Sequence, residues 1–212
     1  MLLSVFPPIV FNLKSTFVLF PRFLSLFVLV SGLLFSLSAQ ADCNIVIDEI
    51  DPFDSLRTVA AASLPIGNML ITQVETIDGP ELAPEAEAVV MHTQNDSLSV
   101  LFLHLELPEY HYVRTKKGFN IKLKMTSDTI IGFYTVPDLG NFSKKTNMRH
   151  YQHTGLVPMD NYYLLTYDTV ELIRVEYQNH RRTFQLTPKQ QIALREAFRC
   201  VGEKVGYYPV KP

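Results

Sequence analysis

Two pairs of side chains have the residue types and the spacing that metal binding or acid–base chemistry requires. His150 and His153 are three residues apart, and on one helical turn both imidazoles would reach a single ion, although zinc needs at least one further protein ligand. His104 and Glu106 are two apart, so on a β-strand they share a face and place a base beside a carboxylate. Both pairs are also typical of ordinary solvated residues. We therefore assign no catalytic residue, cofactor or metal, and keep His150 and His153 as weak metal candidates.

The familiar motifs of enzymes and nucleotide-binding proteins are missing from the sequence. It holds no Gly-rich phosphate loop, Gly-x-Ser-x-Gly elbow, His-Glu-x-x-His helix or calcium loop. The acidic run from Asp48 to Asp54 offers oxygen ligands for Ca²⁺, but turn and capping roles explain Asp51 and Asp54 without an ion. Chemistry at a dedicated site is therefore the less favoured interpretation.

Charge divides unevenly along the chain. Residues 42–109 have a net charge of −12, whereas residues 110–212 have a net charge of +8. The favoured interpretation is that the two halves interleave in one sheet system and attract each other. The alternative is a basic face for an anionic partner, such as a phosphate-bearing glycan or a lipid head group. The candidate anion-binding residues are Lys122, Lys124, Lys144, Lys145 and Arg149.

The first 41 of the 212 residues have the parts of a secretory signal peptide. Arg22 precedes an uncharged run over residues 23–37, and an Ala-x-Ala site follows at Ala39 to Ala41. A helix of that length spans roughly 22 Å, short of the roughly 30 Å hydrocarbon core. We therefore expect a signal peptide over 1–41 and a single exported domain over 42–212, located in the periplasm, at the cell surface or in the secreted space. An uncleaved anchor is the alternative, and only then would the protein contact a membrane.

The two cysteines favour an oxidising compartment. Cys43 follows the expected cleavage site and Cys200 lies in the last expected element, and an even count in an exported chain predicts a disulfide between them. The bridge would close a loop with 156 residues between its ends. The chain-entropy model assigns such a bridge about 4–5 kcal/mol. Metal binding by the two thiols and a nucleophilic cysteine are the minor alternatives.

Short period-2 stretches recur through the exported part. They predict strands over 44–50, 56–62, 69–77, 86–94 and 98–107, with breaks at Gly79-Pro80 and Pro84. The strand over 98–107 is apolar on both faces and belongs in the middle of a covered sheet. Two further hairpins are predicted over 119–136 and over 170–186.

The end of the chain carries the signals of a helix. Residues 137–158 are polar without a clear period and are expected to form a long loop, followed by a short helical turn over 160–168. Thr187, Pro188 and Gln190 mark a helix start, and the apolar stripe continues to Gly202. The expected fold class is mainly β, an antiparallel β-sandwich or partly open barrel of about seven to nine strands, with one C-terminal helix packed on it.

Three short motifs resemble a group of uncharacterised exported bacterial proteins. They are Glu49 to Ser55 with Arg57-Thr58, the strand Ile173 to Val175, and the closing Phe198-Arg199-Cys200. The likeness spreads over most of the exported part and implies export and a single domain. The group carries no activity to transfer, so the resemblance assigns no site residue.

These observations predict a non-catalytic binding or interaction module of the cell envelope or the secreted space, closed by a disulfide. Its partner would be a protein or another envelope component, and export with a net charge of −4 over residues 42–212 argues against nucleic acid. A binder of a small molecule or an anionic ligand in the basic, Tyr-rich C-terminal half is the second hypothesis. A metal-assisted hydrolase, at His150 and His153 or at His104 and Glu106, is the third.

Overall fold

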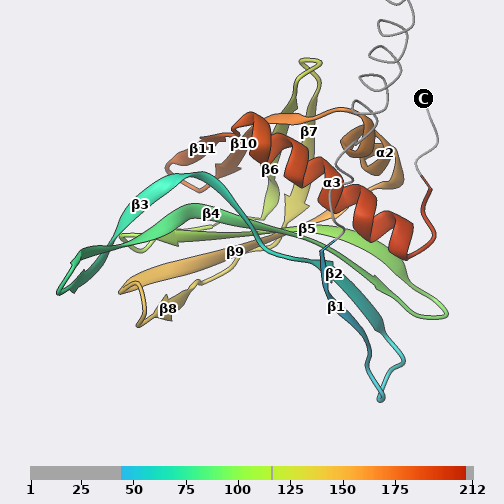
Figure 1. Ribbon diagram of the computed structural model, residues 1–212, viewed down its shortest axis with the longest axis horizontal. Coiled ribbons are helices and arrows are strands. Elements are labelled where there is room, and N and C mark those ends of the chain that lie inside the picture. Colours follow the sequence, from blue (N-terminus) through green and yellow to red (C-terminus); the bar gives the residue numbers. More distant parts are fainter. Residues whose placement is uncertain (1–43, 116, 209–212) are drawn as a thin grey trace, which may run out of the picture. The chain divides into compact units, whose positions relative to one another are not determined.

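The computed structural model describes residues 44–115 and 117–208, which form two antiparallel sheets and two helices (Figure 1). The larger sheet consists of β1 (Ile45–Ile50), β2 (Arg57–Ala61), β3 (Leu64–Thr76), β4 (Gly79–Gln94), β5 (Ser99–Glu109), β8 (Asn141–Ser143) and β9 (Met148–Val157). The smaller sheet consists of β6 (Gly118–Met125), β7 (Ile130–Thr135), β10 (Val170–Glu176) and β11 (Arg181–Gln185). The helices are α2 (Met159–Tyr167) and α3 (Pro188–Lys204). The expected β-rich class with a C-terminal helix is confirmed, with eleven strands in the described part and no closed barrel.

Strand β5 lies in the middle of the larger sheet. The strand order is β1-β2-β4-β5-β9-β8, with β3 also paired to β4, and the smaller sheet has the order β11-β10-β6-β7. Leu103 of β5 pairs with Val90 of β4 on one side and with Gly155 of β9 on the other. The central position predicted from the two apolar faces of this strand is therefore confirmed.

One face of the larger sheet, called here the inner face, carries the core. The smaller sheet and both helices lie on this side (Figure 1). The even spacing of four leucines in β5 points all of them inward, where they are almost fully buried, because alternate side chains of a strand share a face. They join one apolar cluster with inward residues of the smaller sheet and of α3, among them Leu123, Phe133, Ile173, Val175, Leu194, Phe198 and Val201.

The start of α3 follows the predicted capping box. The Thr187 side chain accepts a hydrogen bond from the Gln190 backbone N–H at 3.3 Å, and the Gln190 side-chain oxygen accepts one from the Thr187 N–H at 2.9 Å. The Gln190 amide also donates to the carbonyl oxygens of Pro65 and Gly67, both at 3.1 Å. One side chain thus caps the helix and fastens it to β3.

Ion pairs connect the acidic and the basic half of the chain. Asp48 in β1 contacts Lys204 at the end of α3 at 3.1 Å, and Arg182 in β11 contacts Glu109 at 3.2 Å and Glu85 at 3.7 Å. These contacts agree with the interpretation that the two halves interleave and attract each other.

The loop expected over residues 137–158 is wrong, because this segment contains β8 and the ten-residue strand β9. The inward residues of β9 include His153 and Gly155, which do not register as apolar and hide the period-2 pattern. Gly155 is needed there, since a Cβ at this position would lie 2.6 Å from the Cβ of Phe133 in β7. A close approach of the two sheets therefore removed the sequence signal for the strand.

The chain does turn beside the predicted break at Gly79-Pro80, because β3 ends at Thr76 and β4 begins at Gly79 after the turn at Ile77-Asp78. The predicted break at Pro84 is wrong, because β4 runs through this residue. In this part β4 pairs only with β3, through Glu75–Pro80 and Met69–Pro84, and its pairing with β5 begins at Glu87. A proline has no N–H to donate, which a strand tolerates where one of its edges has no partner. The prolines therefore mark the single-partnered arm of β4.

The predicted signal peptide over 1–41 and Cys43 lie outside the described residues. The signal peptide and the disulfide between Cys43 and Cys200 therefore stay predictions. The described residues belong to one compact unit. Within them, neither helix has the length and apolar character needed to cross a bilayer.

Candidate functional site

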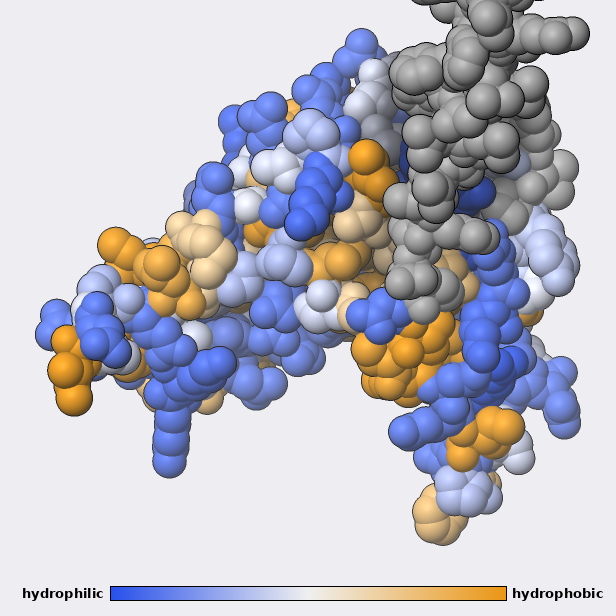
Figure 2. Space-filling view, viewed as in Figure 1, coloured by the Kyte–Doolittle hydropathy of each residue, from blue (hydrophilic) through white to orange (hydrophobic). Residues whose placement is uncertain are grey.

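The face of the larger sheet opposite the core, called here the outer face, carries a row of apolar side chains. Cross-strand pairing places these residues side by side over β1, β2, β4, β5 and β9, and the row consists of Ile47, Ala60, Met91, Phe102 and Leu156. Leu156 is 49% exposed and Ile47 is 39% exposed, whereas Met91 and Phe102 are half-buried and Ala60 is buried, so the row is open to solvent mainly at its two ends. Figure 2 shows apolar side chains gathered below the larger sheet, beside the β1–β2 hairpin.

The β1–β2 hairpin extends this apolar surface away from the body of the sheet (Figure 1). Val46 and Ile50 are largely exposed, and Phe53 at the tip is 97% exposed. Large apolar side chains that gather on a surface mark interaction sites more often than single exposed ones do. The hairpin and the row together therefore form a candidate interaction surface in the described part.

Beside the apolar row, the outer face becomes polar and holds a chain of three hydrogen-bonded side chains. His150 Nδ1 lies 2.6 Å from Glu106 Oε1, and His150 Nε2 lies 2.8 Å from Thr146 Oγ1. Glu106 comes from β5, His150 from β9, and Thr146 from the turn between β8 and β9. This set, called here the Glu106–His150–Thr146 chain, joins residues 40 positions apart in the sequence, between Glu106 and Thr146.

Two carboxylates lie next to each other at the Glu106 end of the Glu106–His150–Thr146 chain. Glu106 pairs directly with Glu87 of β4 on the outer face. Like charges at such positions destabilise a sheet unless other groups compensate them. Ser63 Oγ donates to Glu87 at 2.6 Å, and His150 contacts Glu106, so each carboxylate has a hydrogen-bonding partner of its own.

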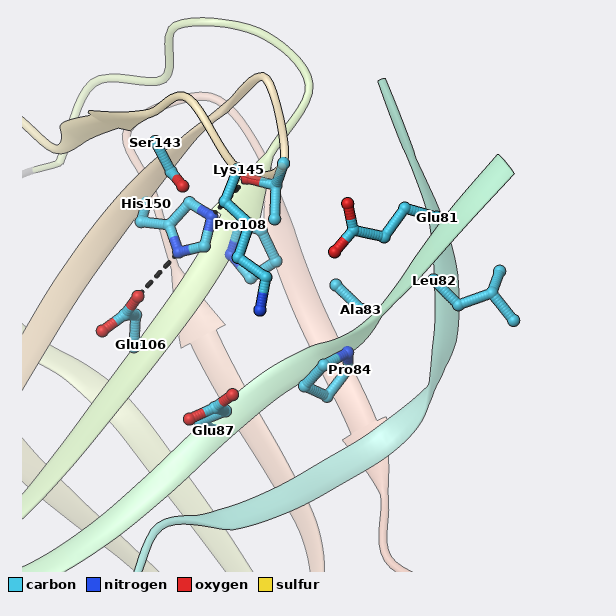
Figure 3. Close-up of a pocket in the computed structure, with 11 residues that line it drawn as sticks. Glu81, Leu82, Ala83, Pro84, Glu87, Glu106, Pro108, Ser143, Lys145 and His150 are labelled. Carbon is cyan, nitrogen blue, oxygen red and sulfur yellow. Dashed lines mark hydrogen bonds and ion pairs between the residues drawn. The ribbon is translucent and has the colours of Figure 1, made fainter. Parts of the chain in front are cut away.

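A small pocket of about 160 Å³ opens over the chain (Figure 3). In Figure 3 the Lys145 side chain reaches into the pocket, between the Glu106–His150 pair and Glu87. The remaining walls come from the β3–β4 arm, including Glu81, Leu82, Ala83 and Pro84, and from Pro108 and Ser143. The pocket therefore brings together a hydroxyl, an imidazole, carboxylates and one ammonium group.

His104 lies on the same face as Glu106, as the two-residue spacing predicted. Its Nδ1 is 2.8 Å from Thr154 Oγ1 of β9, and burial lowers its pKa from the ordinary value. Glu106, however, forms its hydrogen bond with His150, which comes from another strand. The carboxylate therefore has a histidine partner, but from another strand than the sequence suggested.

The metal pair His150 and His153 is not brought together. Both lie in β9, three residues apart, so their side chains point to opposite faces of the sheet. His153 is 1% exposed on the inner face, packs edge-on against Tyr177 at 5.4 Å between ring centroids, and neither ring nitrogen has a hydrogen-bond partner among the described residues. Burial lowers its pKa to about 4. No group of three metal-ligating side chains occurs in 44–115 and 117–208.

The candidate anion-binding residues are spread over different surfaces. Lys122 contacts Glu176 at 2.7 Å, and Lys124 contacts Asp128 and Glu171, both at 2.9 Å, so both lysines are paired with carboxylates on the smaller sheet. Arg149 in β9 donates to the carbonyl oxygens of Leu139 and Gly140. Lys144 and Lys145 lie in the β8–β9 turn, and Lys145 lines the pocket described above. These five residues do not form one basic patch.

The predicted disulfide involves one described residue. Cys200 is buried in α3 and is not a free cysteine. Its proposed partner Cys43 adjoins Asn44, whose carbonyl oxygen accepts from the Ala62 N–H at 2.9 Å just beyond β2, and α3 packs on β2. This arrangement is compatible with the bridge, which stays a prediction because Cys43 lies outside the described residues.

Thr146 is the member of the polar chain that sequence reasoning missed. A single threonine in a polar turn carries no signal of its own. The spacing of Thr146 and His150 becomes meaningful only when β8 and β9 are known to form a hairpin.

Comparison with known proteins does not assign a function. No family model matches the chain, and no match was found among curated proteins or solved structures. The functional argument therefore rests on the geometry of the outer face.

Proposed function

We propose that this protein is an exported binding module that docks a protein segment on the outer face of its larger sheet. The observation that carries the proposal is the apolar row of Ile47, Met91, Phe102 and Leu156, which is exposed at both ends, with the protruding and exposed β1–β2 hairpin beside it. The pocket beside the row, of about 160 Å³, is small, which favours a surface interaction over enclosure of a ligand at this face.

The charges around the apolar row indicate the chemistry of the partner. Glu49 in β1 faces the same side as Ile47, and Glu87 with Glu106 follow the row along β4 and β5. A partner segment that combines apolar side chains with lysine or arginine would complement this surface, because opposite charges steer and orient association. The proposed occupant is therefore a basic amphipathic segment.

The test uses two synthetic peptides of alternating residues, one of leucine and lysine and one of leucine and glutamate. The full chain is expressed for export, purified, and titrated with each peptide, while methyl signals in NMR spectra and heat of binding are recorded. We expect the lysine peptide to bind and to shift the methyl signals of Met91 and Leu156. The glutamate peptide is expected to bind at least tenfold more weakly.

Two matched variants locate the surface. Leu156→Asp places a charge in the row, whereas Leu98→Asp changes a leucine of similar exposure, 47%, in the β4–β5 turn. Only Leu156→Asp should weaken binding of the lysine peptide, by about tenfold, which corresponds to about 1.4 kcal/mol. Equal affinity for both peptides, no binding of either, or equal weakening by both variants would overturn the proposal.

A further inference from the structure

The Glu106–His150–Thr146 chain has the connectivity of a nucleophile, a base and an orienting carboxylate. A carboxylate that contacts Nδ1 holds the proton on that nitrogen, which leaves Nε2 with a lone pair. Thr146 then donates its hydroxyl hydrogen to His150 Nε2 over 2.8 Å, and His150 donates to Glu106 over 2.6 Å. The same order of hydroxyl, imidazole and carboxylate activates the nucleophile in hydrolases of unrelated folds.

The threonine is held in place by backbone contacts from a third segment. The carbonyl oxygen of Thr146 accepts from the Gln73 N–H of β3 at 3.1 Å, and the Asn147 side chain donates to the Gln73 carbonyl at 3.2 Å. Asn147 has a φ of 53°, in the left-handed region that asparagine tolerates, so the turn is specified at this position. A catalytic site requires its nucleophile and its general base to be held in a fixed relative geometry by the surrounding residues.

The pocket supplies space for a substrate and a cation for its developing charge. Thr146, His150 and Glu106 all line the pocket of about 160 Å³, which is open to solvent. The Lys145 side chain points into it (Figure 3). An ammonium group at the position of a developing oxyanion stabilises the transition state of acyl transfer.

We propose that this pocket is a hydrolytic site for small acyl esters, in addition to the docking function of the outer face. Thr146 Oγ attacks the ester carbonyl carbon while its proton passes to His150 Nε2, and Lys145 faces the resulting oxyanion. The intermediate collapses by breaking the bond to the alcohol oxygen, which takes the proton from His150. The acyl group then remains on Thr146.

Water completes the reaction. It attacks the acyl carbon and gives a proton to His150, and the bond to Thr146 breaks as Thr146 Oγ takes that proton back. The net change is ester plus water to carboxylic acid plus alcohol, so the reaction uses no metal or redox partner. Thr146 and His150 are the catalytic residues, and Glu106 is a positioning residue that acts through His150.

The experiment measures hydrolysis of p-nitrophenyl acetate by the purified full chain, with mass spectrometry of the protein after reaction with a fluorophosphonate. We expect saturable hydrolysis and covalent labelling of Thr146. Thr146→Val and His150→Asn should each lower kcat/KM by about a hundredfold or more, because a general base contributes at least that factor. Thr146→Ser should retain activity, and Glu106→Gln should reduce kcat and change its pH profile.

His111→Gln is the matched control, since His111 is an exposed histidine outside the pocket. It should leave the rate unchanged, which separates site-specific hydrolysis from the weak reaction of any surface imidazole. Melting temperatures of all variants show whether they fold. If Thr146→Val does not fold, His150→Asn provides a second variant that is expected to lose activity. The proposal is overturned if no saturable hydrolysis occurs, if the phosphonate labels another residue, or if folded Thr146→Val or His150→Asn keeps the wild-type rate.

Discussion

Replacement of His153 by phenylalanine should remove a large part of the acid sensitivity of the fold. His153 lies between the two sheets against Tyr177, with both ring nitrogens buried and without a hydrogen-bond partner in the described residues. The folded protein therefore holds this ring in its neutral form. Phenylalanine has a similar shape and no group to protonate.

The magnitude follows from the difference between the folded and unfolded pKa of His153. Burial lowers the folded value to about 4, whereas the ordinary value is 6.5. Below pH 6.5 the unfolded chain binds a proton that the folded protein does not, so stability is fully present above pH 6.5 and is lost as the pH falls toward 4. At 1.36 kcal/mol per pKa unit, the loss between pH 7 and pH 4.5 amounts to about 2–3 kcal/mol.

The assay is urea unfolding of wild type, His153→Phe and the control His111→Phe at several pH values from 7.5 to about 4.5, above the range in which Asp48 titrates. The hydrogen bond with Arg57, and to a smaller extent that with Lys204, lowers the pKa of Asp48 to about 2. The contribution of Asp48 to the free energy of unfolding is therefore lost only between about pH 4 and pH 2. His92 and His104 also have pKa values lowered by burial and contribute acid sensitivity of the same sign to all three proteins.

The free energy of unfolding of wild type and of His111→Phe should fall together with decreasing pH. That of His153→Phe should fall about 2–3 kcal/mol less over the same range. It should match or exceed wild type at pH 7, because the variant no longer buries the two unpaired ring nitrogens of His153. Parallel pH curves for wild type and a folded His153→Phe protein would show that the ring is not held neutral, and the reasoning would fail.

Three further predictions concern packing and export. Gly202→Ala should lower the free energy of unfolding by about 1–3 kcal/mol in thermal melts, because a Cβ there would lie 1.9 Å from the Tyr162 hydroxyl oxygen, and a melt equal to wild type would contradict this packing. Cys43→Ser should destabilise the exported protein by up to about 4–5 kcal/mol under non-reducing conditions, and equal melting temperatures would count against the bridge. N-terminal sequencing of the exported protein should begin at Asp42, whereas a retained hydrophobic segment would indicate an anchor.

The helices and strands that were predicted correctly are those that a single local sequence pattern specifies. The capping box at Thr187 and Gln190 located α3, and the leucine alternation in β5 located the middle of the larger sheet. Strand β9 was missed because its inner face carries His153 and Gly155, whose presence there depends on Tyr177 and Phe133 across the sheet interface. Such residues are selected by their tertiary neighbours, so local periodicity does not reveal them.

The candidate site was predictable only in part for the same reason. The two-residue spacing showed that His104 and Glu106 share a face, and the structure agrees. The contact between Glu106 and His150 depends on the pairing of β5 with β9, through Pro108 opposite His150. A long-range register of this kind cannot be read from either strand alone.

The pairing of β5 with β9 also sets the order in which the chain can acquire its structure. Residues from Leu101 to Glu109 find their second neighbour only when Val157 to Arg149 are available. Until then one edge of the most apolar strand has no partner, and such an edge invites association with other chains. A polypeptide that is released N-terminus first therefore carries this strand with one unpaired edge until about three quarters of its 212 residues have emerged.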